Sequence, residues 1–348
     1  MSGGIAQLIA IGAQDAHLVG NPEVSFFRSQ YKRHTNFSSV VERQVIQGNP
    51  AAGGMSSIRF ERKGDLLSYV YLTKKNGSDI ETFTDSDIDK VELLIGGQVI
   101  DTIDNEFALE IATPLLSSST NKVSLANGAN ATSRYRNFYP LTFWFCENFQ
   151  SALPLVSLQY HDVEIRITWS KNLPARTYEL WTKYIYLDTE ERENLVKNPQ
   201  NMLVYQNQKA IASGTNTQEL NFNHPIKFLA SDKYLFNGSP NNESIRLQIN
   251  GIDIGDSKPM TPHYTRVPYH YHTDSQYATL AGDLYQTNKF LYPFCLNTNK
   301  LQPTGTLNFS RLDSVRLIGS NVFTSSVYGV NYNILKIQNG MGGLLYAN

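Results

Sequence analysis

Short apolar or alternating runs recur along most of the chain, separated by Gly, Asn, Asp and Pro. Four such runs lie between residues 38 and 103, three more between residues 138 and 188, and the second half repeats the pattern from residue 202 to residue 338. Runs of this length, bounded by turn-forming residues, predict β-strands. The Gly96-Gly97 pair between VELLI and QVID predicts a tight hairpin turn.

Two segments have the pattern of helices. NEFALEIATPLL, residues 105–116, predicts a helix limited by Pro114. TEERENL, residues 189–195, places acidic residues after Thr189, which predicts a helix with Thr189 as N-cap and a solvated EERE face, ending at Asn198-Pro199. We place a domain boundary near Asn198. The polar, irregular stretch 256–283 predicts a long ordered loop.

An internal repeat relates the two halves. VELLIGGQVIDT resembles IRLQINGIDIGD, FYPLTFWFCENF resembles FLYPFCLNTN with the cysteines in matching places, VEIRIT pairs with VRLIGS, and YIYLD pairs with YNILKI. All four pairs keep the same order and are offset by about 150 residues. Such a pattern predicts a duplicated β-domain.

The repeat defines the expected fold class as all-β, with two consecutive eight-stranded jelly rolls and short helices in loops and linker. An immunoglobulin-like sandwich is the alternative, but each half exceeds the roughly 100 residues of such a domain. We expect an N-terminal arm over residues 1–24, a first jelly roll with the linker helix over residues 25–198, and a second jelly roll over residues 199–348.

Composition and charge limit the kinds of partner that we expect the protein to bind. Charged residues make up 18% of the chain, aromatic residues 11%, and the formal net charge is −1. No basic block is longer than Lys32-Arg33, so we expect no direct nucleic-acid binding, which needs many cations to neutralise phosphates. The two cysteines lie far apart, the first basic residue is Arg28, and no apolar stretch is long enough to cross a bilayer, which predicts a soluble protein made in the cytosol.

Candidate chemistry is sparse, and we expect neither enzyme activity, nor a cofactor, nor a metal site. His270 and His272 would face one side of a strand, but further ligands at suitable spacing are missing. The glycines in residues 340–343 precede too few residues for a phosphate-binding helix and favour a tight turn at the chain end. Cys146 and Cys295 lie in apolar runs and are expected in the core rather than as nucleophiles.

Six Asn-x-Ser/Thr sequons occur, at Asn36, Asn76, Asn130, Asn237, Asn242 and Asn308. Without a signal peptide, the secretory route is not expected to glycosylate them. If another route attaches glycans, the sequons in apparent loops are the candidates: Asn76, Asn130, Asn237 and Asn242.

Several longer segments carry a family resemblance that runs from the first residues to the last. These segments are GNPEVSFFRSQYKRHTNF (20–37), ALPLVSLQYHDVEI (152–165), YIYLDTEER (184–192), LNFNHPIKFLA (220–230), GTLNFSRLD (305–313) and YNILKIQNGMGGLLYAN (332–348). They resemble major capsid proteins of nucleocytoplasmic large DNA viruses, of the chlorella virus and iridovirus type.

The resemblance implies a structural protein of an icosahedral capsid. Three copies would form a pseudo-hexagonal homotrimeric capsomer that tiles the shell facets, and the protein would be made and assembled in the host cytoplasm. Its partners would be further copies, minor capsid proteins and, through the arm, an inner viral membrane. The chain is shorter than familiar members of the family, which leaves a minor capsid paralogue as an alternative.

Jelly rolls are also common in lectins, so carbohydrate binding is the rival function. Such binding needs exposed aromatic side chains gathered in one concave site. The candidates are tyrosines of the 256–283 stretch: Tyr264, Tyr269, Tyr271 and Tyr277.

Overall fold

A computed structural model describes residues 3–84, 87–117, 137–236, 243–273 and 289–346. The chain divides into two units, Met1–Asn36 and Phe37–Asn348. The first unit contains two short helices, α1 (Gly3–Ile9) and α2 (Ala16–Val19), neither of which buries a residue.

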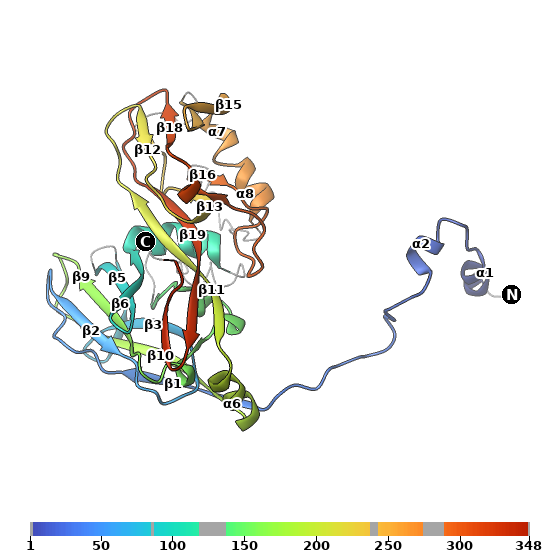
Figure 1. Cartoon of the computed structure of the whole chain (residues 1–348), viewed down its shortest axis with the longest axis horizontal. Helices are drawn as coiled ribbons and strands as arrows, with labels where there is room; N and C mark the ends of the chain where they lie inside the picture. Colours follow the sequence, from blue (N-terminus) through green and yellow to red (C-terminus); the bar gives the residue numbers. More distant parts are fainter. Residues whose placement is uncertain (1–2, 85–86, 118–136, 237–242, 274–288, 347–348) are drawn as a thin grey trace. The chain divides into compact units, whose positions relative to one another are not determined.

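The second unit begins with two antiparallel sheets built from strands β1 to β10 (Figure 1). One sheet has the order β1-β10-β3-β4, with β7 and β8 also paired to β3, and the other has the order β2-β9-β5-β6. The strands are β1 (Phe37–Gln44), β2 (Met55–Arg59), β3 (Leu66–Asn76), β4 (Asp79–Glu81), β5 (Ile88–Ile95), β6 (Gln98–Asp104), β7 (Tyr139–Pro140), β8 (Leu153–Pro154), β9 (Val163–Trp169) and β10 (Thr177–Leu187).

Strands β11 to β20 form two further sheets. One has the order β11-β19-β13-β16, with β17 paired to β13 and β20 to β19, and the other has the order β12-β18-β14-β15. The strands are β11 (Gln200–Ala210), β12 (Thr217–Glu219), β13 (Pro225–Ala230), β14 (Ser244–Ile249), β15 (Ile252–Pro259), β16 (Leu291–Pro293), β17 (Leu307–Asn308), β18 (Val315–Gly319), β19 (Val327–Gln338) and β20 (Met341–Leu344).

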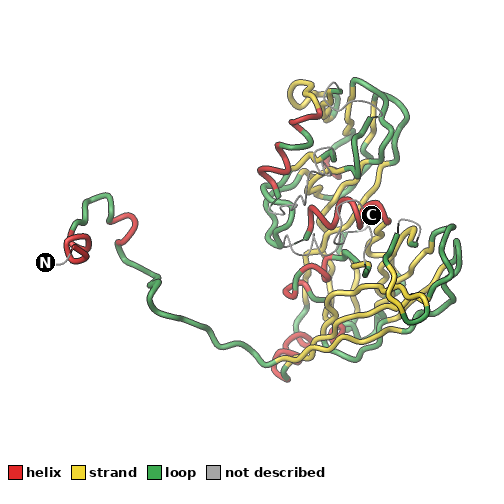
Figure 2. The backbone as a smooth tube through the Cα atoms, turned by 180° about the vertical axis from the view of Figure 1, so that it is seen from behind, coloured by secondary structure: helices red, strands yellow, loops and turns green. Residues whose placement is uncertain are grey.

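The two halves have the same topology, which confirms the predicted repeat and the double jelly roll. Strands run through both halves, and helices are short (Figure 2). Strands β1, β10, β3 and β7 correspond to β11, β19, β13 and β16, and strands β2, β9, β5 and β6 correspond to β12, β18, β14 and β15. The registers agree in detail, since β3 pairs Tyr71 with Pro140 where β13 pairs Phe228 with Pro293.

The same register corrects one detail of the predicted repeat. Cys146 lies six residues after Pro140, whereas Cys295 lies two residues after Pro293, so the cysteines do not occupy matching places. The helix α5 (Trp144–Glu147) carries Cys146 and has no counterpart directly after β16.

The helix predicted for residues 105–116 is present as a π-helix, η1 (Phe107–Ala112), followed by α3 (Thr113–Leu116). Pro114 lies in the first turn of α3, a position that proline tolerates, so it does not end the helix. Every residue of both segments is buried. Short helices also occupy the loops: η2 (Phe149–Ser151), η3 (Leu155–Ser157) and η4 (Phe309–Arg311).

The loop predicted for residues 256–283 is wrong over its described part. Strand β15 continues to Pro259, and two helices follow, α7 (Met260–His263) and α8 (Val267–His272). Pro268 lies in the first turn of α8, where proline begins a helix instead of breaking it.

The linker between the rolls is helix α6 (Thr189–Lys197), which has no buried residue. Its N-cap is Asp188, whose carboxylate accepts a hydrogen bond from the Thr189 backbone N–H, so the predicted cap was one residue too late. Arg192 pairs with Asp65 at 2.9 Å and holds the helix on the first roll.

Two apolar clusters form the core. One fills the first roll and continues across the junction to Phe228, Tyr328 and Val330 on the second roll. The other lies inside the second roll and includes Leu229 and Val327. Because neighbouring residues of a strand point to opposite faces, the sheet of β13 and β19 is apolar on both sides. Its inner face packs in its own roll and its outer face packs on the first roll.

The β5–β6 hairpin depends on Gly96, and substitution there gives a testable prediction. Gly96 and Gly97 have φ values of +59° and +81°, as the predicted tight turn requires. A Cβ on Gly96 would lie 2.5 Å from His161 Nδ1, whereas one on Gly97 would meet nothing. Gly96→Ala is expected to lower the free energy of unfolding by about 2–4 kcal/mol, from left-handed strain plus the clash.

Gly97→Ala is the matched control and is expected to cost about 1 kcal/mol, because it adds strain without a clash. Urea denaturation of the two variants measures the difference. Equal losses would show that His161 does not constrain the turn.

Candidate functional site

Hydrogen bonds join the two rolls along strands β6 and β11, which lie beside each other. Asp101 Oδ1 accepts hydrogen bonds from the backbone N–H groups of Asn207, at 3.0 Å, and of Thr102, at 2.9 Å. The side chain of Gln206 also donates to the Ile100 carbonyl. Asp101 is buried, and burial raises its pKa to about 7, although the two N–H donors act in the opposite direction.

Acidic residues at the end of β6 receive a second set of donors from the other roll. Lys209 Nζ lies 2.7 Å from Asp104 Oδ2 and 3.2 Å from Glu106 Oε2. The Tyr328 hydroxyl donates to the same two carboxylates, at 2.9 and 2.8 Å. Burial, followed by the neighbouring carboxylates, raises the pKa of Tyr328 well above its usual range, so this hydroxyl stays a donor.

The helix of residues 105–116, which is buried from Phe107 to Leu116, joins the first roll to the outer face of the second. Lys289 Nζ lies 2.5 Å from Glu110 Oε2 and donates to the Glu110 carbonyl at 2.9 Å. Both side chains are less than a tenth exposed. The ring of Phe107 lies 5.8 Å from that of Tyr328. Sequence reasoning missed this ion pair, although a carboxylate in a helix as apolar as FALEIA was a signal that Glu110 has a buried partner.

Strand β20 and the turn before it also contact the first roll at the junction. The turn at Gly340 and strand β20 place Gly342 against His161, whose Nδ1 lies 2.8 Å from the Gly342 carbonyl oxygen. The Gly340 carbonyl accepts from the Tyr160 N–H at 2.9 Å. Asn339 and Gly340, with φ of +54° and +77°, form the predicted tight turn, whereas Gly342 and Gly343 lie on β20. The two rolls are therefore joined by apolar packing, a buried ion pair and backbone contacts.

The outer face of the first roll, in contrast, carries an open groove of about 540 Å³. Its lining includes Tyr69 and Tyr71 on β3, Phe138 and Phe149. Phe149 is 62% exposed, and Lys183 lies over the rings of Tyr69 and Phe149 at 5.4 and 5.0 Å. Exposed aromatic side chains gathered in one groove make it a candidate interaction site.

The histidines and cysteines that the sequence offers as candidates for chemistry do not form a common site. His270 and His272 lie on helix α8 rather than on a strand, so the expected shared orientation is wrong, and His272 Nδ1 contacts the Cys295 carbonyl at 2.9 Å. Within the described residues, no group of three or more His, Cys, Asp or Glu is placed to hold a metal ion. Cys295 is buried, which raises its thiol pKa, and Cys146 is partly buried against the core.

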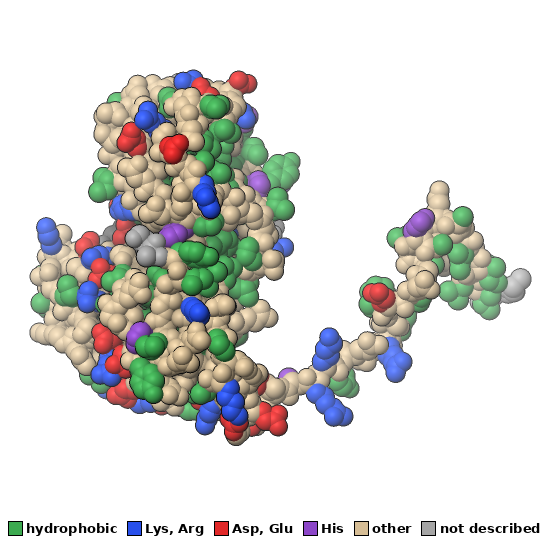
Figure 3. Space-filling view, viewed as in Figure 1, with side chains coloured by type: hydrophobic (Ala, Val, Ile, Leu, Met, Phe, Trp, Pro, Cys, Tyr) green, Lys and Arg blue, Asp and Glu red, His purple; other side chains and the backbone are tan. Residues whose placement is uncertain are grey.

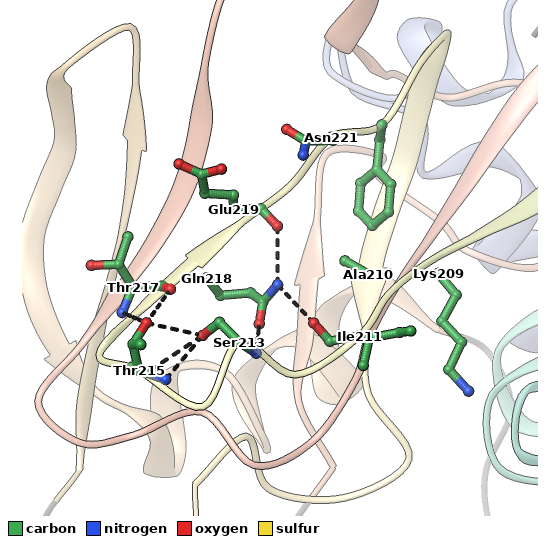
Figure 4. Close-up of a pocket in the computed structure, with 10 residues that line it drawn as sticks. Lys209, Ala210, Ile211, Ser213, Thr215, Thr217, Gln218, Glu219 and Asn221 are labelled. Carbon is green, nitrogen blue, oxygen red and sulfur yellow. Dashed lines mark hydrogen bonds between the residues drawn. The ribbon is translucent and has the colours of Figure 1, made fainter.

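The tyrosines proposed for carbohydrate binding do not form one platform. Tyr264 stacks on Tyr292 at 5.5 Å, Tyr269 packs on the core, and Tyr271 is exposed on α8. Tyr277 lies outside the described residues. An open pocket of about 550 Å³ in the second roll has polar groups that bond one another (Figure 4). The Gln218 amide accepts from the Ser213 N–H and donates to the carbonyls of Ile211 and Glu219.

Of the four candidate glycan sites, Asn76 is exposed at the end of β3, in the turn to β4. Asn130, Asn237 and Asn242 lie outside the described residues. Lysine and arginine side chains are interspersed with aspartate and glutamate on the side shown in Figure 3. In the part of the chain that the structure describes, no helix is long and apolar enough to cross a membrane.

Comparison with known proteins agrees with this architecture. A family profile described as "Major capsid protein N-terminus" matches residues 25–188. The chain is 33% identical to the major capsid protein of Pyramimonas orientalis virus and 29% identical to that of Paramecium bursaria Chlorella virus 1, with 100% of each protein covered in both comparisons.

Solved structures share the fold. A model of the PBCV-1 virus capsid superposes with a TM-score of 0.74 at 24% identity, covering 93% of this chain and 100% of that one. The Faustovirus major capsid protein gives a TM-score of 0.65 at 10% identity and covers 94% of both chains.

Two jelly rolls of the same topology in one chain, joined through a buried junction, define a double jelly-roll capsid protein, a structural component of the virion rather than an enzyme. The sequence relatives identify its family. The chain belongs to the family of major capsid proteins of nucleocytoplasmic large DNA viruses.

Proposed function

We propose that three copies of this chain form a pseudo-hexagonal capsomer and that these capsomers tile the facets of an icosahedral shell. The observation that carries the proposal is the shared topology of the two rolls. Three chains then supply six similar domains, which a closed cyclic arrangement places around one axis. The open apolar groove on the first roll supports contact between chains, because such a surface is stabilised by burial.

The N-terminal arm is proposed to contact neighbouring capsomers and an inner viral membrane. Several of its apolar side chains are exposed, including Leu8 and Leu18, at 76% and 85%. Apolar surface exposed to this degree is stabilised when another surface buries it. Minor capsid proteins are the further proposed partners, and synthesis and assembly are proposed to occur in the host cytoplasm without direct contact with the genome.

The proposed domains are the arm (1–24), the first roll with α6 (25–198) and the second roll (199–348). Strands β1–β10 precede α6 and strands β11–β20 follow it, which supports the boundary near Asn198. Asn76, Asn130, Asn237 and Asn242 remain the proposed sites of virus-directed glycan attachment.

Light scattering of the purified full chain, coupled to size exclusion, tests the capsomer. We expect a single species with three times the mass of the chain, and hexagonal outlines in negative-stain images. A stable monomer that binds on a glycan array would overturn the capsomer in favour of a carbohydrate-binding role. A trimer that joins pre-formed shells without forming facets would indicate a minor capsid component.

A further inference from the structure

A small cavity at the junction between the rolls brings together polar side chains that lack partners. The cavity, of about 30 Å³, is lined by Trp144 of the first roll and by Tyr205, Lys227, Thr298 and Tyr332 of the second. Among the described residues, the Trp144 Nε1–H and the hydroxyl groups of Tyr205, Thr298 and Tyr332 are buried and have no hydrogen-bond partner. Leaving a buried polar group unsatisfied is costly, so several of them around one cavity indicate a bound group that satisfies them.

The strand pairing explains why three of these side chains lie together. In the order β11-β19-β13, Tyr205 lies directly opposite Tyr332, so both side chains point to the same face of the sheet. The register shifts between Ile226 and Phe228 where β13 pairs with β19, which makes Lys227 the extra residue of a bulge. A bulge redirects a side chain, and Lys227 Nζ lies 5.4 Å from the centre of the Tyr332 ring. Lys227 therefore reaches the face of the second roll that the first roll covers.

The charges around the cavity leave one positive charge without compensation. Lys227 is 3% exposed, and no carboxylate of the described residues pairs with its ammonium group. The other charged residues of the lining, Glu147 and Lys300, have opposite signs, and each interacts with another group of the chain.

Neither titration of Lys227 nor its neighbouring thiol removes this imbalance. Burial lowers the pKa of Lys227 to about 8, so the side chain is mostly protonated at neutral pH. Burial also raises the pKa of the Cys295 thiol, which is therefore neutral and supplies no negative charge. A cation buried to this extent requires a negative charge beside it.

The donors and the size of the cavity define the class of ligand. Lys227 Nζ and Trp144 Nε1 can only donate hydrogen bonds, and the three hydroxyl groups are able to donate as well. A ligand that accepts from all of these groups and carries the missing charge is an anion. One water occupies roughly 10–15 Å³ of such a cavity, so about 30 Å³ admits a monatomic anion and excludes sulfate, phosphate and carboxylates.

We propose that this cavity binds a halide ion, which is chloride in the cell. The ion neutralises Lys227 and accepts hydrogen bonds from Trp144 on the first roll and from hydroxyl groups on the second. It is a structural ligand that stabilises the contact between the two rolls. The site lies within one chain, so it is independent of the proposed capsomer.

Thermal unfolding of the full chain in sodium chloride and in sodium gluconate, at equal ionic strength, tests the site. Gluconate is too large for the cavity. We expect the wild-type melting temperature to be higher in chloride by about 2–4 °C or more, because a ligand that binds only the folded chain stabilises it. Sodium bromide should act as chloride does.

Two lysine variants separate the site from general effects of the salts, which act on every variant alike. Lys227→Met should lose the difference between chloride and gluconate, whereas Lys197→Met, which removes an exposed lysine of α6, should keep it. A Lys227→Met chain that retains the wild-type difference would overturn the site. So would a wild-type chain that responds to the two salts as Lys227→Met does.

Tyr332→Phe gives a second test in a variant that should fold, because it removes only a hydroxyl without a partner among the described residues. The chloride concentration at which stabilisation begins should rise about tenfold or more, since a hydrogen bond to a charged ligand is lost. An unchanged concentration would overturn the placement of the ion beside Tyr332.

Crystals of the full chain soaked in sodium bromide show the ion directly. We expect an anomalous-scattering peak beside Lys227 Nζ in the wild-type chain and none in Lys227→Met. Density in the wild-type cavity without an anomalous signal would show that water fills it, and this would overturn the proposal.

Discussion

Replacing Lys289 by methionine is expected to lower the free energy of unfolding by about 3–5 kcal/mol, because it leaves the buried Glu110 carboxylate without its cation. The two side chains are 5% and 8% exposed and 2.5 Å apart, and Lys289 also satisfies the Glu110 carbonyl. Urea denaturation at neutral pH measures the loss.

Two further variants separate the buried charge from simple packing. Glu110→Leu combined with Lys289→Met removes both charges and should recover most of the loss, since apolar residues of similar volume can replace a buried ion pair. Lys197→Met removes an exposed lysine that pairs with Glu193 on α6, and it should cost less than about 0.5 kcal/mol. A loss in the double variant as large as in Lys289→Met would mean that the charge is not the cause.

The stability of the chain is expected to depend on pH through Asp101, and Asp101→Asn should remove that dependence. Asp101 has a folded-state pKa of about 7, against about 3.9 in the unfolded chain. Because the folded pKa is the higher one, the stabilisation is complete below pH ~4 and is lost as the pH rises to ~7. The total is about 4 kcal/mol, at roughly 1.36 kcal/mol per pKa unit.

Asparagine is a close test, because both backbone donors bond Oδ1, which its side chain retains. The difference in unfolding free energy between wild type and Asp101→Asn should fall by about 4 kcal/mol between pH 4 and pH 8, measured by urea denaturation at each pH. A difference that stays constant with pH would show that Asp101 is ionised in the folded chain.

The sequence predicts the parts of this fold that depend on local pattern. The Gly96-Gly97 turn, the strand runs and the 105–116 helix follow from neighbouring residues, and the repeat predicts the second roll from the first. The loop expected over residues 256–283 was wrong where Pro259 precedes helix α7 and Pro268 lies in the first turn of α8, positions that proline tolerates.

The junction could not be predicted in the same way. Asp101 meets Asn207, and Glu110 meets Lys289, across 106 and 179 positions of sequence, and neither partner has a distinctive local pattern. Strand β15 has the pattern of an ordinary sheet segment, and only the structure shows that it is exposed along its whole length. Which surface of a roll is buried within the chain therefore depends on the geometry of the duplicated domains.

Helix α6 tethers the two rolls through nine residues, and this has a kinetic consequence. A short tether holds the two partners at an effective concentration on the order of millimolar, so the internal contact forms at a rate independent of how much protein the cell has made. Contacts between separate chains in the proposed capsomer have no such tether, so their rate of formation would depend on the bulk concentration of the protein.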